Sequence, residues 1–271
     1  NPSNLGLVGY WSFDDATSTR RSPIVQDFSG NNNNGIMTNM DPATDNVPGK
    51  RGRALDFDGS NDFVDAGTGS SIHGLSTMSF CSWYRSNTRG GNGGGRFFQS
   101  AADNNGHRML YWDGATDNQI YFQVDYSTQD LIARSTNSFS HSTWNHICVT
   151  WNGSTTVSSG VVFYKNGSVV AHAGSGDVNA TGSLVSDSGQ SFAIGDRPST
   201  GGRAFNGSID EARIYNRALS SEDVRALYRS GAVKHTNPSN LGLVGYWSFD
   251  DATSTTRSTL VQDFSGNNNN G

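Results

Sequence analysis

The sequence predicts an all-β protein: a two-sheet antiparallel sandwich with one short helix close to its C-terminal end. Glycine is abundant, with 33 of the 271 residues, whereas charged residues make up only 16% of the chain. Many short apolar segments follow one another, with Gly, Asn and Asp residues between them. A long series of short strands joined by turns, almost without helical periodicity, is typical of two packed β-sheets.

The expected strands are short and rich in aromatic and β-branched residues. They cover residues 8–13, 54–57, 63–65, 78–84, 97–100, 109–112, 119–125, 131–134, 145–151, 161–165, 168–173, 192–194 and 207–215. Glycine-containing pairs mark three of the turns, at Asp58-Gly59, Asp113-Gly114 and Asn166-Gly167. The regular spacing of these signals favours one antiparallel sandwich over a mixture of strands and helices.

One helix is expected over residues 221–230. Ser220 and Asp223 have the spacing of a capping box, with Asp in place of the usual Glu. Val224 begins an apolar face, and Gly231 is suited to the left-handed position that ends a helix. The helix is expected to be structural.

Charge and hydropathy exclude two kinds of partner. The formal net charge is −5, whereas nucleic acids and anionic membranes attract clustered Lys and Arg. No stretch approaches the ~20 consecutive apolar residues of a membrane span, and no basic and then apolar leader opens the sequence. We therefore expect no nucleic-acid partner and no membrane insertion, with any export signal outside this sequence.

Two cysteines, Cys81 and Cys148, are the only ones in the chain. A bridge between them would close a loop of about 68 residues and constrain the unfolded chain by roughly 4 kcal/mol. Two buried free thiols are the alternative, because free cysteine packs like a small apolar residue. The sequence leaves a disulfide and free thiols open.

A loop rich in oxygen-bearing side chains follows the first expected strand. It contains Asp27, Asn31, Asn33 and Gly35 within nine residues, without sulfur or imidazole. Ca²⁺ prefers carboxylate, amide and backbone carbonyl oxygens, whereas zinc and copper favour the absent ligands. The sequence therefore predicts a structural calcium site here, and a turn held by its own Asp and Asn side chains is the alternative.

The start of the chain recurs at its end. Residues 1–35 are repeated as residues 237–271, with differences only at positions 20, 23 and 24 of the first copy. Such identity extends to loop residues that a shared fold would not preserve, and it indicates duplication of a whole unit. We predict a domain over residues 1–235, and in 236–271 the first strand and calcium loop of the next tandem repeat. Neighbouring repeats of the chain itself are then expected partners.

Eight segments in a fixed order carry a resemblance to a known family. They are Gly-Tyr-Trp-Ser-Phe-Asp-Asp at 9–15, the Asp27 loop at 27–35, Ala-Leu-Asp-Phe-Asp-Gly at 54–59, Met-Ser-Phe-Cys-Ser-Trp-Tyr at 78–84, the segment 144–153, Val-Phe-Tyr-Lys-Asn-Gly at 162–167, Phe-Ala-Ile-Gly at 192–195 and the segment 207–220. In order and spacing they resemble the laminin-G-like, concanavalin-A-like jelly-roll domains of bacterial surface and carbohydrate-processing proteins. The resemblance covers nearly all of residues 5–232.

The resemblance implies a jelly roll of antiparallel strands in an exported protein. It also implies that the Asp27 loop meets the first acid of the Ile-Asp-Glu segment, here Asp210, at the calcium ion. Asn32 stands where relatives commonly have Gly, which makes the backbone of this loop a point to check. Asn tolerates positive φ better than most residues.

No catalytic pattern is recognisable. Glucanases of the resembling fold place their carboxylates on alternate residues of one strand, in a Glu-x-Asp-x-x-Glu pattern that this sequence lacks. No Gly-x-Ser-x-Gly motif is present, and the six histidines lack metal-ligand spacing. We therefore expect no enzymatic activity.

Sugar binding remains a candidate activity. Trp112, Tyr121 and Tyr126 lie on middle strands where rings could stack on sugars, and Arg134 could bind hydroxyl groups. Aromatic residues of a sandwich are more often part of the core, which is the alternative for each of them.

Three functions are compatible with this sequence. The first is a calcium-stabilised lectin-like module of an extracellular or cell-surface protein, used in adhesion to a glycan or a surface protein. The second is a structural subunit that self-assembles into a filament or array by exchange of its terminal strand. The third is an accessory carbohydrate-binding module of a glycan-degrading enzyme.

Overall fold

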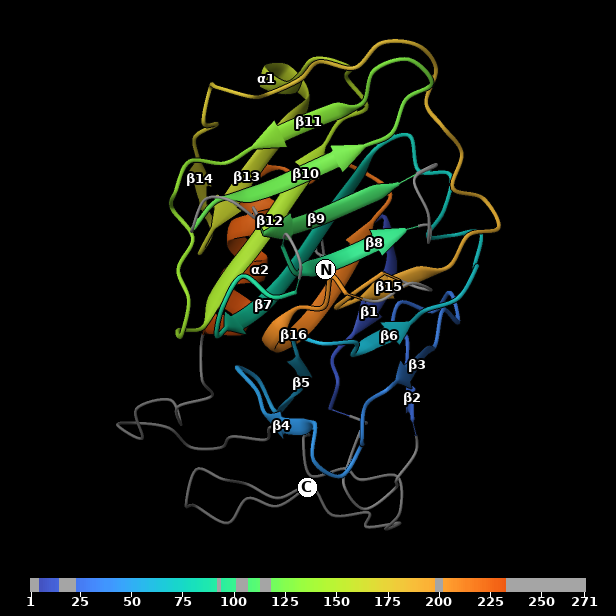
Figure 1. Cartoon of the computed structure of the whole chain (residues 1–271), viewed down its shortest axis with the longest axis vertical. Helices are drawn as coiled ribbons and strands as arrows, with labels where there is room; N and C mark the ends of the chain where they lie inside the picture. Colours follow the sequence, from blue (N-terminus) through green and yellow to red (C-terminus); the bar gives the residue numbers. More distant parts are fainter. Residues whose placement is uncertain are drawn as a thin grey trace, which may run out of the picture. The chain divides into compact units, whose positions relative to one another are not determined.

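Two antiparallel sheets of eight strands each pack face to face in the computed structural model (Figure 1). The structure describes residues 5–14, 23–91, 94–100, 107–112, 118–197 and 202–232. Chain contacts divide the protein into residues 1–232 and 233–271, and the second unit lies outside the described residues. The predicted second repeat therefore lies outside them too. The all-β sandwich expected from the sequence is confirmed.

The first sheet, sheet A, has the order β14-β13-β12-β7-β16-β5-β4, and β1 also pairs with β16. Its strands are β1 (Leu7–Trp11), β4 (Asn46–Pro48), β5 (Arg53–Asp58), β7 (Met78–Ser86), β12 (Asn145–Trp151), β13 (Val161–Lys165), β14 (Ser168–Val170) and β16 (Asn206–Tyr215).

The second sheet, sheet B, has the order β11-β10-β9-β8-β15-β6-β3-β2. Its strands are β2 (Ile24–Val25), β3 (Gly35–Thr38), β6 (Phe63–Asp65), β8 (Arg96–Ser100), β9 (Arg108–Trp112), β10 (Ile120–Val124), β11 (Leu131–Arg134) and β15 (Phe192–Ile194). Strands β8 to β11 lie in front of the long strands of sheet A in Figure 1.

The core between the sheets follows from the alternation of side chains along each strand. Phe80 of β7 and Phe98 of β8 meet across it, with ring centroids 4.6 Å apart. Trp11 and Phe192 form another contact between the two layers. Aromatic rings fill most of this space, as their abundance in the sequence suggests.

A second apolar layer lies on the outer face of sheet A, beneath helix α2 (Ser221–Ala232). Cys81 and Cys148 lie opposite each other in β7 and β12 and are joined in a disulfide beneath this helix. Ser220 accepts a hydrogen bond from the Asp223 N–H, and the Asp223 carboxylate accepts one from the Ser220 N–H. The helix therefore begins with the reciprocal capping box expected from the sequence.

The end of this helix differs from the expectation. Gly231 lies inside α2, which continues to Ala232. A Cβ at Gly231 would overlap the indole of Trp83, so this glycine allows close packing of helix and sheet rather than ending the helix. Three short strands, β2, β3 and β4, and the single turn α1 (Val157–Gly160) were also not expected.

Candidate functional site

A row of four side chains crosses the outer face of sheet B. Arg96 of β8 pairs in register with Tyr111 of β9, which pairs with Tyr121 of β10 and through it with Arg134 of β11. The Arg96 guanidinium lies 4.1 Å from the Tyr111 ring centroid, the two tyrosine rings are 5.2 Å apart, and the Arg134 guanidinium lies 4.7 Å from the Tyr121 ring centroid. The row alternates along its strands with the core residues Leu110, Trp112, Phe122 and Ala133.

A pocket of about 360 Å³ opens beside this row. Strands β8, β9 and β10 supply half of its lining residues, and the segments before β9, after β10 and between β15 and β16 supply the other half. The lining residues are Arg96, Gln99, His107, Met109, Tyr111, Gln123, Asp125, Asp130, Arg197 and Arg203. We call this cavity the sheet B pocket. Four of its polar lining residues, Arg96, Gln99, His107 and Asp125, are buried. Buried polar groups that converge on a cavity mark it as the candidate site.

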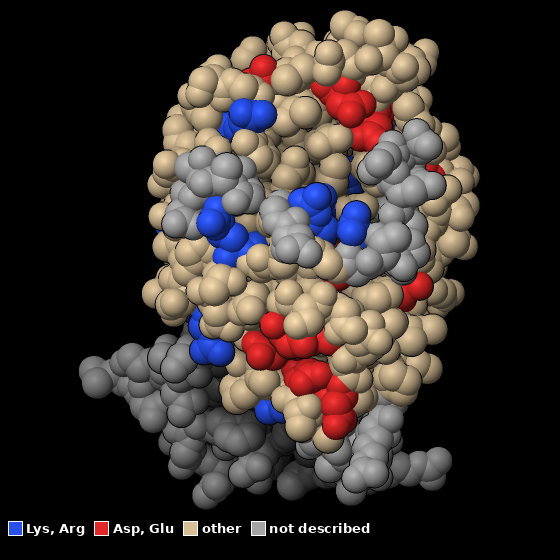
Figure 2. All heavy atoms as spheres, in the orientation of Figure 1, with Lys and Arg blue, Asp and Glu red and all other residues tan. Residues whose placement is uncertain are grey.

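Three arginines form one part of the pocket. Arg96 is only 7% exposed, and its Nε donates a hydrogen bond to Gln99. Burial, together with the like charges of Arg203 and Arg197, lowers the pKa of Arg96 to about 10. Figure 2 shows Lys and Arg side chains gathered near the middle of this face, with acidic groups above and below them.

Carboxylates and amides form the other part. Asp125 accepts hydrogen bonds from the His107 backbone at 3.1 Å and from Gln123 at 3.0 Å, and the His107 Nδ1 lies 3.2 Å from it. Burial alone would raise the pKa of Asp125, but the hydrogen bonds from His107 and Gln123 outweigh it and lower the pKa. Asp130 accepts from Tyr126 and Gln123. These acids are held as oriented hydrogen-bond acceptors.

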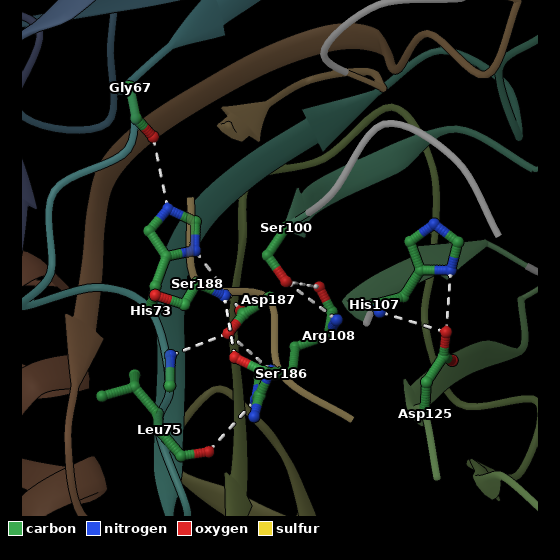
Figure 3. Close-up of polar contacts among 11 residues, drawn as sticks. Gly67, His73, Leu75, Ser100, His107, Arg108, Asp125, Ser186, Asp187 and Ser188 are labelled. Atoms are coloured by element: carbon green, nitrogen blue, oxygen red, sulfur yellow. Dashed lines mark hydrogen bonds and ion pairs between the residues drawn. The ribbon is translucent and has the colours of Figure 1, made fainter. Parts of the chain in front are cut away.

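A buried ion pair fixes β9 from the inner side. Arg108 points inward from β9, next to His107, and its Nη1 lies 2.8 Å from the Asp187 carboxylate (Figure 3). Asp187 also accepts from the Gly74 N–H and lies 3.4 Å from the His73 Nδ1, while the Arg108 Nε donates to Leu75. A buried ion pair with several hydrogen bonds holds its strand in place, because a shift of the strand would leave a buried charge without its partners.

Two of the four sugar-binding residues expected from the sequence lie on this face. Tyr121 and Arg134 belong to the row described above. Trp112 is fully buried among Tyr84 and Phe97, which corrects its expected place on the binding face. Tyr126 also joins the core cluster, at 9% exposure. Tyr111 and Gln123 occupy positions in the sequence that alternate with core residues along their strands. This alternation would have identified both of them as outward-facing residues.

The predicted metal loop is closed on itself. The Asp27 Oδ1 accepts from the N–H groups of Tyr10 and Ser29, and its Oδ2 accepts from the Ser29 hydroxyl and the Asn33 N–H. These four bonds fill the acceptor sites of one carboxylate. Asn31 and Asn33 donate to backbone carbonyls of β1, and Gly35 is the first residue of β3. Asn32, in doubt from the sequence, adopts φ 59°.

Asp210 lies elsewhere, on β16. The Asp27 segment runs along the edge of β1 that faces away from β16, because the N–H and C=O of Tyr10 bond to residues 27 and 28. Asp27 therefore bonds to its own loop and to β1, whereas Asp210 bonds to the turn at Arg51, and the shared calcium site stays a prediction. No cluster of three or more His, Cys, Asp or Glu side chains fit for a metal occurs in the part of the chain that the structure describes.

Asp210 nevertheless has an unfilled acceptor. It is fully buried; its Oδ2 accepts from the Arg51 N–H, and its Oδ1 has no hydrogen-bond partner among the described residues. Burial, together with the charges of Glu211 and Asp14, raises the pKa of Asp210 to about 8. Asp14 in turn accepts from the Arg53 N–H, so the two carboxylates hold one turn between β4 and β5. A cation fits Asp210 better than it fits Asp27.

Comparison with known families decides the classification. A profile described as the concanavalin A-like lectin/glucanases superfamily matches residues 58–225, more than half of the chain. The chain belongs to this superfamily. No curated protein matches the chain. No helix among the described residues is long and apolar enough to cross a membrane.

Solved structures of this superfamily's fold are similar. Domain 4 of AbnA, an extracellular GH43 arabinanase from Geobacillus stearothermophilus solved with arabinotriose, is 20% identical, with a TM-score of 0.58 over 82% of this chain and 98% of that one. The binding domain of Paraclostridial Mosquitocidal Protein 1 is 17% identical, with a TM-score of 0.58 over 83% of this chain and 52% of that one. Trypanosoma rangeli sialidase in complex with sialic acid is 18% identical, with a TM-score of 0.56 over 83% of this chain and 33% of that one. At these identities the likeness concerns the fold.

Proposed function

We propose that this domain binds carbohydrate at the outer face of sheet B and catalyses no reaction. The observation that carries the proposal is the sheet B pocket, which Tyr111, Gln123 and Asp125 line and beside which the Tyr121 ring packs against that of Tyr111. Aromatic rings cover the apolar faces of sugars, while oriented amides and carboxylates bond to hydroxyl groups. The two carboxylates that line the pocket, Asp125 and Asp130, each accept hydrogen bonds from within the protein, which supports a binding rather than a hydrolytic role.

The similar structures support the same class of ligand. Domain 4 of the arabinanase, which is part of a glycan-degrading enzyme, was solved in complex with arabinotriose. An accessory module of this kind is therefore a second form of the proposal. The disulfide between Cys81 and Cys148 favours an extracellular or cell-surface location, since disulfides persist in oxidising compartments.

Titration calorimetry against a panel of oligosaccharides tests this function. We expect one or more glycans to bind, with Tyr121→Ala and Gln123→Ala weakening the binding at least tenfold. Gln190→Ala is the matched control, because Gln190 does not line the pocket and should bind as the wild type does. If no glycan binds, or if the control weakens binding equally, the proposed function is wrong.

We also propose a structural calcium ion held by Asp210 and Asp14. Support comes from the buried, unpartnered Oδ1 of Asp210 and from the neighbouring carboxylate of Asp14. Backbone oxygens and water would complete a calcium shell, as is usual for this ion. Bound calcium would neutralise the charge that burial makes costly at Asp210 and would tie β16 to the turn before β5.

A further inference from the structure

The arginine end of the sheet B pocket has an unsatisfied cationic group. Only 7% of the surface of Arg96 is exposed, yet its Nη1 has no hydrogen-bond partner among the described residues. Its Nε is engaged by Gln99, and its plane lies over Tyr111, so the orientation of the guanidinium is fixed. A buried guanidinium N–H without an acceptor is costly, which is the condition that an anionic ligand relieves.

Charge at this end favours an anion. Arg197 and Arg203 line the pocket with Arg96, and both act on it as like charges. The carboxylate of Asp196, which attracts Arg96, is fully buried and accepts hydrogen bonds from the backbone N–H groups of Arg197 and Arg203. Three guanidinium groups therefore gather at this end of the pocket.

The other end of the pocket suits hydroxyl groups. Asp125 and Asp130 are both held by hydrogen bonds from within the protein, and Gln123 bridges them. Because these acids already have donors, they do not need a cation from the ligand. Asp125, Asp130 and Gln123 present acceptors and an amide opposite the arginines.

We infer that the sheet B pocket binds an acidic glycan, with a carboxylate or sulfate of the sugar at Arg96, Arg197 and Arg203 and its hydroxyl groups toward Gln123 and Asp125. This inference rests on the proposed carbohydrate-binding function and adds the class of sugar. Guanidinium groups form paired, charge-assisted hydrogen bonds with such anions. A neutral sugar could offer the Arg96 Nη1 only hydroxyl or ring oxygens, without the negative charge of a carboxylate or sulfate.

Matched glycan pairs test the inference. Each carboxylated oligosaccharide, such as a galacturonic acid trimer, is compared by calorimetry with its methyl ester, and each sulfated one with its desulfated parent. We expect the acidic member of a pair to bind at least tenfold more tightly. The preference should shrink as salt rises from 50 to 500 mM, because ions screen the attraction. The two sets of pairs show whether the anion is a carboxylate or a sulfate.

Variants distinguish anion binding in this pocket from a general effect of the protein's positive charges. Arg96→Gln and Arg203→Gln should each weaken acidic-glycan binding roughly ten- to hundredfold, as expected for the loss of one charge-assisted hydrogen bond. Arg203→Gln also keeps the test valid if loss of the buried Arg96 impairs folding, which circular dichroism would detect. Arg225→Gln, on the exposed face of α2, is the matched control and should bind normally.

The outcomes are distinct. If neutral and acidic members of every pair bind equally, this inference is overturned and the proposed carbohydrate binding stands. If Arg225→Gln weakens binding as much as Arg203→Gln, the pocket is not the site of the anion. If no glycan of either kind binds, the proposed function fails and the inference with it.

Discussion

His146 is an uncharged imidazole buried under helix α2. Its ring lies 5.3 Å from that of Trp83 and 6.1 Å from that of Tyr228, and neither ring nitrogen has a hydrogen-bond partner among the described residues. Burial lowers the pKa of His146 to about 3, and the nearby Arg213 contributes. The folded state therefore binds fewer protons here than the unfolded state at mildly acidic pH.

We predict that acid destabilises the protein through this residue. Since the folded pKa lies below the unfolded value of about 6.5, stability is complete above that value and falls as pH falls toward 3. Between pH 8 and pH 5 the loss from His146 should be about 2 kcal/mol. Urea unfolding at both pH values measures it, and His146→Phe should remove most of the difference. A variant that keeps the full difference would contradict the explanation.

The limits of sequence reading are clearest at neighbouring residues. Tyr111 and Trp112 are adjacent on β9, so one must face the core and the other the outer surface. The alternation was recognisable, but the sequence does not state which face is covered by the other sheet, and the larger ring was assigned to the wrong side. Arg96 was missed for a related reason, because nothing local distinguishes a buried arginine from an exposed one.

At the scale of elements, the helix start was predictable because its determinants are local. Ser220 and Asp223 are three residues apart and satisfy each other's backbone N–H groups. The role of Gly231 was not predictable, because it depends on Trp83, which is distant in sequence. The short strands β2, β3 and β4 were missed because their pairing comes from distant partners rather than from apolar runs of their own.

Removal of the cap should weaken α2 measurably. Ser220→Ala deletes the hydroxyl that accepts from the Asp223 N–H, and we expect a loss of about 1 kcal/mol in the free energy of unfolding. Ser221→Ala is the control, since the Ser221 hydroxyl donates its hydrogen bond to the side chain of the neighbouring Glu222 and not to the helix backbone. Chemical denaturation of both variants measures the difference. Equal losses would show that the cap contributes nothing specific.

At the scale of the whole molecule, the sandwich followed from the number and spacing of apolar segments, whereas the convergence of polar residues did not. Asp27 and Asp210 both belong to segments that resemble the family, yet β1 lies between these segments. Asp27 bonds within its own loop, and Asp210 bonds to the turn at Arg51. A sequence gives the residue types of a cation site, but the sheet order decides which of them meet.

Chelation should reveal which carboxylate holds a cation. We expect EDTA to lower the melting temperature of the calcium-loaded protein by roughly 5–10 °C, the effect of an ion at about 100 times its Kd on a domain of this size. Asp210→Asn should abolish this response, and Asp27→Asn should retain it. The reverse pattern would move the ion to the Asp27 loop, and a wild type indifferent to EDTA would exclude the calcium proposal.

The repeated segment allows a prediction about assembly. Strand β1 pairs with β16 of its own domain, and its sequence, Leu-Val-Gly-Tyr-Trp, recurs at residues 243–247. A copy with the same sequence satisfies the same register, so we propose that it pairs with β16 of another chain in exchange for β1.

Light scattering should then give a mass that grows with concentration for residues 1–271 and stays monomeric for residues 1–232. In the full chain, Trp247→Asp should prevent this growth, because an aspartate cannot replace the buried Trp11 at the end of β1. If the full chain stays monomeric at every concentration, strand exchange through this segment does not occur.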